Sequence, residues 1–128
     1  MEKGKMIIGI SEATSEIFQS LTRIQETAKK TCVFTDKETR YIVSEFTAML
    51  KLGNKHIGEV KKLLSPKLQL PEDQKAAHLQ RMFEEMKGLR GQTERFETAF
   101  IELAEQRKKD ADDVTAIKQL LHGKKQRV

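Results

Sequence analysis

A seven-residue repeat between Leu79 and Leu121 constrains the fold of this chain more than any other feature. Its positions are spaced alternately by three and four residues, and only Arg107 and Asp110 among them are charged. An α-helix turns once every 3.6 residues, so this spacing places the side chains on one stripe that must be buried against another helix or another chain. The positions are Leu79, Met82, Met86, Leu89, Thr93, Phe96, Phe100, Leu103, Arg107, Asp110, Val114, Ile117 and Leu121.

The composition favours helices over strands. Glu, Lys, Gln, Leu and Met have good helix propensity, whereas the chain has only seven Gly, two Pro and 5% aromatic residues. No run of alternating β-branched residues is flanked by turn residues, so we expect no β-sheet. A length of 128 residues is typical of one domain. The sequence therefore predicts a single all-α domain over residues 1–128.

Two further helices are predicted before this repeat. Apolar residues at three- and four-residue steps predict a helix over about residues 8–30. The next helix, over about residues 36–64, begins at a capping box formed by Thr35 and Glu38 and ends before Pro66. Only a few residues connect these helices, so we expect them to be antiparallel neighbours.

The third helix begins near Glu72 and carries the long repeat. Charged residues at Arg107 and Asp110 favour a kink or short break near residues 107–112, which gives a helix over 72–107, a short fourth helix over 112–121 and a basic tail over 123–128. Without a break, the helix would be about 75 Å long and would extend far beyond its partners. The predicted fold is an elongated antiparallel helical bundle of three long helices, with a short fourth helix if the break occurs.

Two glycines lie inside the second predicted helix, although each costs about 1 kcal/mol relative to Ala. We interpret Gly53 and Gly58 as positions where helices approach closely or where glycine is tolerated. A hinge is the alternative interpretation.

The sequence contains none of the familiar catalytic motifs. The residues three positions before His56, His78 and His122 are not Glu, so the pattern of di-iron carboxylate bundles is missing, and neither a His-Glu-x-x-His motif nor a phosphate-binding loop occurs. We interpret His56 and Glu59 as a solvated pair, and the single cysteine, Cys32, as a partly buried structural residue. We expect a protein that is not an enzyme and that has no cofactor or metal site.

Two kinds of surface are candidates for binding. The net charge of +5 is spread along the chain, but the second helix and its linker have a basic side, and the tail is basic. The end of the long repeat supplies apolar residues that need a partner. The candidate interaction residues are Lys51, Lys55, Lys61, Lys62, Lys67, Lys124, Lys125, Arg127, Val114, Ile117 and Leu121.

These observations favour a non-catalytic protein that binds another macromolecule, as an adaptor, chaperone or assembly subunit. We expect a protein partner or self-association. The alternatives are a bundle that opens to bind lipid or another apolar ligand, and a basic helix face that binds an anionic membrane. Nucleic-acid binding is a weaker alternative, because the Lys and Arg residues are not concentrated in one segment. One unpaired cysteine favours the cytoplasm, although a secreted chain whose leader has been removed would show the same pattern.

Overall fold

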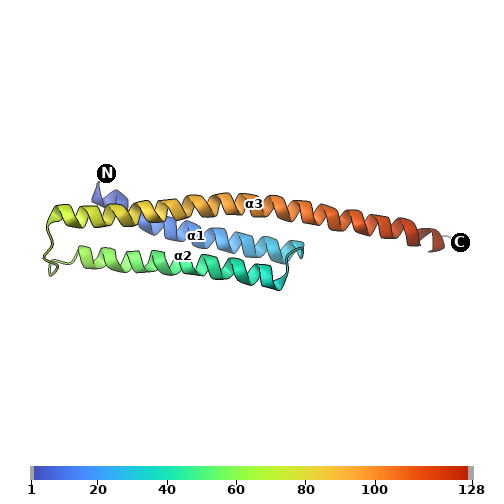
Figure 1. The fold of residues 1–128 in the computed structure, drawn as a ribbon, viewed down its shortest axis with the longest axis horizontal. Helices are drawn as coiled ribbons and strands as arrows, with labels where there is room; N and C mark the ends of the chain where they lie inside the picture. The colour runs from blue at the N-terminus through green and yellow to red at the C-terminus, as the bar shows by residue number, and fades with distance from the viewer. Residues whose placement is uncertain (1, 127–128) are drawn as a thin grey trace.

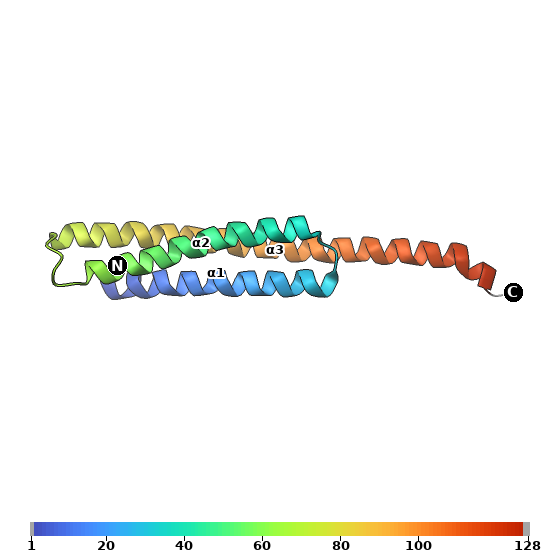
Figure 2. The same cartoon turned by 90° about the horizontal axis from the view of Figure 1, so that it is seen from below.

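Three helices form the computed structural model of the protein: α1 (Lys3–Thr31), α2 (Asp36–Leu63) and α3 (Glu72–Gln126). The structure describes residues 2–126, and the side chains of residues 2–122. In this part of the chain there is no strand, so the predicted all-α bundle is confirmed. Figures 1 and 2 show α2 running back along α1, and α3 returning beside both and continuing well beyond the connection between α1 and α2.

Helix α1 is the centre of the bundle. It packs extensively against both α2 and α3, whereas α2 and α3 touch each other much less. The buried apolar side chains of α1 recur at three- and four-residue steps and contact the inner sides of the other helices. They are Met6, Ile10, Ala13, Ile17, Leu21 and Ile24. As a result, the core lies along α1, and a space between α2 and α3 is left uncovered.

Helix α1 begins earlier than predicted, at Lys3 instead of near Ile8. The physical reason is that Met6 lies four residues before Ile10, on the same side of the helix, and both are buried. At the other end, Cys32 caps the helix in a left-handed conformation with φ of 54°, and its backbone amide donates to the carbonyl of Ala28.

Helix α2 starts at the predicted capping box. The Thr35 hydroxyl accepts a hydrogen bond from the Glu38 amide at 3.1 Å, and the Glu38 carboxylate accepts one from the Thr35 amide at 3.0 Å. The helix ends at Leu63, close to the predicted end. Residues 64–71 then connect it to α3, as expected from Ser65 and Pro66.

The predicted break near residues 107–112 is wrong, because α3 is one continuous helix of 55 residues. At 1.5 Å per residue it is about 82 Å long. Arg107 occupies a repeat position at the end of the bundle, where its charge is paired with Glu38. Asp110 lies beyond the bundle in solvent, so neither charge is buried and neither has to interrupt the helix. The predicted basic tail over 123–128 is also partly wrong, since α3 continues to Gln126.

The two glycines of α2 have different environments. A Cβ atom built at Gly53 would lie 2.4 Å from Thr14 Oγ1 and 3.1 Å from Met86 Cε, so Gly53 permits close contact of α2 with α1 and α3. A Cβ atom at Gly58 would meet nothing within 4 Å. The expected close approach is therefore found at Gly53, while Gly58 is a tolerated glycine.

Candidate interaction surface on α2 and α3

An apolar groove lies between the first half of α2 and the middle of α3. Two adjoining depressions, of about 220 and 270 Å³, share Tyr41, Ile42 and Phe96. We call this feature the groove. Its lining residues are Phe34, Glu38, Tyr41, Ile42, Glu45, Phe46 and Met49 on the α2 side, and Gln92, Thr93, Phe96, Ala99, Phe100 and Leu103 on α3.

Aromatic contacts form the floor of the groove. Phe34 stacks on Phe100, with ring centroids 4.3 Å apart, and Phe46 meets Phe96 with centroids 5.9 Å apart. Phe46 and Phe100 are buried, whereas Phe96 and Tyr41 remain 40% and 67% exposed at the rim. Because buried rings support the exposed ones, the groove presents an apolar surface on a rigid base.

Arg107 lies beside Glu38 and Phe34, at the end of the bundle where α3 leaves it. Its guanidinium donates to both carboxylate oxygens of Glu38, at 2.9 and 3.0 Å, and to the carbonyl of Val33 at 3.2 Å. The same group lies 5.0 Å from the ring centroid of Phe34. Hydrogen bonds from Arg107 and then from the Thr35 amide lower the pKa of Glu38 to about 2. Arg107, a charged residue in the apolar repeat, thus joins α3 to the start of α2 through these hydrogen bonds.

Beyond Arg107, residues 108–122 of α3 form an overhang that contacts no other helix. Val114, Ile117, Leu120 and Leu121 are between 50% and 71% exposed. The repeat places Val114, Ile117 and Leu121 in line with Phe96 and Leu103, which also remain partly exposed along the groove. These three predicted residues therefore extend the apolar stripe of α3 beyond the charged positions Arg107 and Asp110.

The basic side of α2 is a separate surface. Lys51, Lys55 and Lys62 are exposed and share one face, because they are spaced by four and seven residues, and this face lies opposite buried Gly53 and Val60. Lys61 lies beside them, and Lys67 is exposed in the connection to α3. This surface is at the end of the bundle away from the overhang (Figure 1). The side chains of Lys124 and Lys125, and all of Arg127, lie outside the described residues.

The interpretation of His56 and Glu59 as a solvated pair is wrong. His56 is buried and its Nε2 lies 3.2 Å from Glu85 of α3, while Glu59 lies 2.9 Å from Nε2 of His78 of α3. The hydrogen bond from His78 lowers the pKa of Glu59. Sequence reasoning missed both pairs because it considered only neighbours on one helix. Antiparallel alignment of α2 with α3, which the short connection already implies, could have brought them together.

A further cross-helix contact joins α1 to α3. The Glu97 carboxylate accepts hydrogen bonds from Ser20 at 2.8 Å and from the guanidinium of Arg23 at 2.6 and 2.8 Å. These bonds, chiefly those from Arg23, lower the pKa of Glu97. Glu97 therefore lies on the side of α3 that faces α1.

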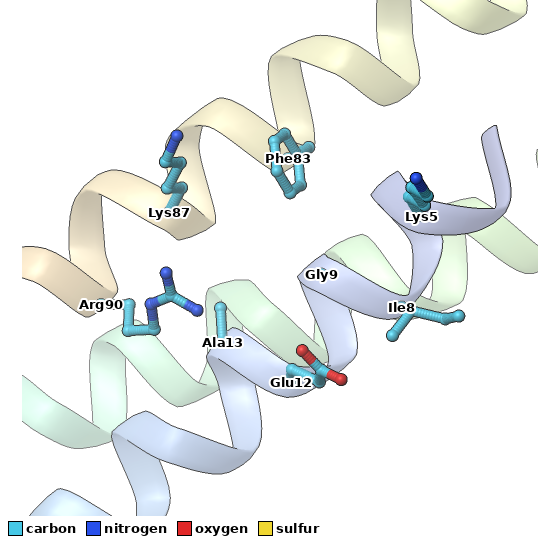
Figure 3. A pocket seen from close by; sticks show the side chains of 8 residues that line it. All are labelled: Lys5, Ile8, Gly9, Glu12, Ala13, Phe83, Lys87 and Arg90. Carbon is cyan, nitrogen blue, oxygen red and sulfur yellow. The ribbon is translucent and has the colours of Figure 1, made fainter. Parts of the chain in front are cut away.

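A separate depression outside the groove, of about 320 Å³, lies between α1 and the first half of α3 (Figure 3). A Cβ atom on Gly9 would lie 2.4 Å from the ring of Phe83, so this glycine is what lets the ring approach α1. Lys5, Lys87 and Arg90 stand around it, and Arg90 pairs with Glu16 at 3.4 Å. The depression is an open packing feature with a mixed rim, and it brings together no predicted site residue.

The described residues show no cluster of side chains suited to metal binding. Within residues 2–122, no three His, Cys, Asp or Glu side chains are placed to hold a metal ion. Cys32 is exposed, so its interpretation as a partly buried residue is wrong; the reason is its position at the helix cap, outside the core. In the described chain, none of the helices is long and apolar enough to span a bilayer.

Comparisons with known proteins give no family for this chain. Protein-family models, curated proteins and solved structures all gave no match. A function must therefore be inferred from the surfaces themselves. Of these surfaces, the groove and the overhang carry several of the large apolar side chains that the fold leaves exposed, among them Tyr41, Phe96, Leu103 and Ile117.

Proposed function

We propose that this protein is a non-catalytic helical-bundle protein that binds another protein through the groove and the overhang, as an adaptor, chaperone or assembly subunit would. The observation that carries this proposal is an apolar stripe on α3 that is interrupted only by the charged positions Arg107 and Asp110. It is buried at Met86, partly exposed at Phe96 and Leu103, and open to solvent at Ile117. Contiguous exposed apolar surface of this kind is typical of interaction sites.

The shape of the surface favours a helix as the bound element. A groove between two helices, with apolar side chains at three- and four-residue steps, accepts an amphipathic helix as the fourth member of a bundle. The overhang also gains from such binding. A helix of about 15 residues without tertiary contacts is marginally stable in water, and packing against a partner would supply the missing stabilisation.

The other candidate functions have less support. Lipid uptake would require the core to open, yet Ile10, Ile17 and Met86 are fully buried at the contacts between helices. Membrane binding could use the lysine face of α2, but that face lacks the large apolar side chains that anchor an interfacial helix. An exposed lysine row is more simply a solvated surface.

Site-specific photo-crosslinking tests the proposal. A benzophenone amino acid is placed at Ile117 or Leu103 of the full chain, and at Gln25, which is exposed on α1, as the control. We expect a discrete protein adduct from positions 117 and 103 in cells and no such adduct from position 25. Equal, diffuse labelling from all three positions, or flotation of the protein with anionic liposomes without any adduct, would contradict the proposal.

A further inference from the structure

We infer that the partner in the groove is the overhang of a second copy of this chain, and that two copies form an antiparallel two-fold dimer along α3. This inference rests on the proposed function and names its partner. In a two-fold dimer each copy supplies both an overhang and a groove, so every contact occurs twice. The two uncovered surfaces of the monomer would then cover each other.

The lengths of the two surfaces agree. The overhang, residues 108–122, is about 22 Å long, and the α3 side of the groove, from Gln92 to Leu103, is about 18 Å long, at 1.5 Å per residue. The overhang is therefore long enough to fill the groove, and only a few of its residues would extend beyond it. A partner helix from another protein would fill the groove but would leave the overhang to be covered separately.

The apolar residues also match in order. A two-fold axis beside α3 between Arg107 and Asp110 places Val114 of one copy at the level of Leu103 of the other. Ile117 then comes level with Phe100, and Leu121 with Phe96. Antiparallel coiled coils align residues in this way, with the two types of core position facing each other. The partly exposed Leu103 and Phe96 thus meet the exposed Val114 and Leu121, while Ile117 lies over Phe100, which is buried in the floor of the groove.

The two charged positions of the repeat support the antiparallel arrangement. With the axis between them, Arg107 of each copy comes level with Asp110 of the other, so each Asp110 faces a guanidinium that also stays paired with Glu38 of its own chain. A parallel pair in the same register would place Asp110 against Asp110 and Arg107 against Arg107, which is unfavourable. Charges that interrupt the apolar stripe in one chain therefore become complementary between two chains.

The edge of the groove on α2 adds a further complementary charge. Lys37 is exposed and lies four residues before Tyr41, so it is on the groove side of α2. In the antiparallel arrangement residues 108–113 of the overhang pass this lysine, and because they contain three Asp and two Lys their net charge is −1. Attraction at this edge favours the same orientation as the pairing of Arg107 with Asp110.

Sedimentation equilibrium of the full chain over a range of concentrations tests for the dimer. We expect reversible dimerisation, and we expect Ile117→Asn to raise the dimer Kd at least about tenfold, because two buried apolar side chains are lost per dimer. Ile101→Asn is the matched control. Ile101 is an exposed isoleucine of the same helix that lies off the stripe. The dimer Kd of the Ile101→Asn variant should therefore be nearly unchanged. A chain that stays monomeric up to millimolar concentration, or equal effects of both variants, would overturn the inference.

Disulfide trapping tests the orientation. In a Cys32→Ser background, Leu103→Cys and Val114→Cys chains are oxidised separately and as a mixture. We expect a crosslinked dimer only in the mixture, because copies of the same residue would lie about 16 Å apart along the helices. Crosslinking of Val114→Cys with itself would show a parallel dimer and would overturn the inference. A monomeric chain that photo-crosslinks from position 117 to a different protein would also overturn it, while leaving the proposed function in place.

Discussion

The two halves of α3 have the same sequence pattern and opposite environments. From Leu79 to Phe100, most repeat positions are buried, with exposures of 0–4% at Leu79, Met82, Met86 and Phe100, whereas Val114, Ile117 and Leu121 are at least half exposed. The difference arises because α1 and α2 have 29 and 28 residues and α3 has 55. A repeat thus determines which face of a helix needs a partner, but the lengths of the other helices determine whether the same chain provides one.

The largest expected effect comes from matched truncations of one apolar side chain in each half. Met86→Ala should lower the free energy of unfolding by about 2–5 kcal/mol, because it removes a fully buried side chain and leaves a cavity. Ile117→Ala should change it by less than about 0.5 kcal/mol at a concentration where the chain is monomeric. Urea unfolding followed by circular dichroism measures both. Similar losses for the two variants would show that the overhang is covered within the monomer.

A pair of glycine variants in α2 sharpens the contrast between covered and open positions. Gly53→Ala should destabilise the protein by about 1–3 kcal/mol, because the new methyl group would overlap Thr14. Gly58→Ala should stabilise it by up to about 1 kcal/mol, since nothing lies near the new methyl group and Ala is the better helix former. Thermal unfolding distinguishes the two signs. Stabilisation by both substitutions would mean that α2 does not approach α1 closely at Gly53.

The junction between the two halves should be sensitive to acid. The pKa of Glu38 falls from 4.5 to about 2 in the folded protein, so its ionised form is favoured by folding. This contribution is complete above about pH 4.5 and is lost as the pH falls toward 2. Arg107→Met, which removes the main cause of the shift, should therefore reduce the loss of stability between pH 5 and pH 2. Parallel acid titrations of both proteins measure this, and identical profiles would show that the ion pair does not contribute.

The contrast between the two halves of α3 also explains which features of the fold the sequence predicts correctly. The capping box at Thr35 and the repeat through Met86 correctly predicted a helix start and a buried stripe, because both depend on local spacing. The break near Arg107 was predicted wrongly, because local reasoning treats a charge in an apolar stripe as an interruption. In the fold, Glu38 is brought near by the return of the chain and satisfies that charge.

The sequence predicts only part of the candidate surface, because spacing along one helix is again the only information it gives. Val114, Ile117 and Leu121 were identified from the repeat alone, and the structure leaves them exposed. The groove was not predicted, because it results from α1 packing against both neighbours while α2 and α3 separate. Tyr41 and Phe96 acquire their place at its rim only from that arrangement. Spacing along one helix contains no information about the separation of two others.

The smallest expected effect is the removal of the overhang itself. A chain that stops after Ala111 retains Arg107, its contacts with Glu38 and Val33, and every buried side chain of the described core. Its free energy of unfolding should therefore stay within about 0.5 kcal/mol of the full chain when both are monomeric, while its helical circular dichroism signal falls and its self-association is lost. Unfolding at low protein concentration, combined with sedimentation at high concentration, measures these quantities separately. A clear loss of monomer stability would mean that the overhang contributes to the bundle, and that the two halves of α3 differ less than their exposure indicates.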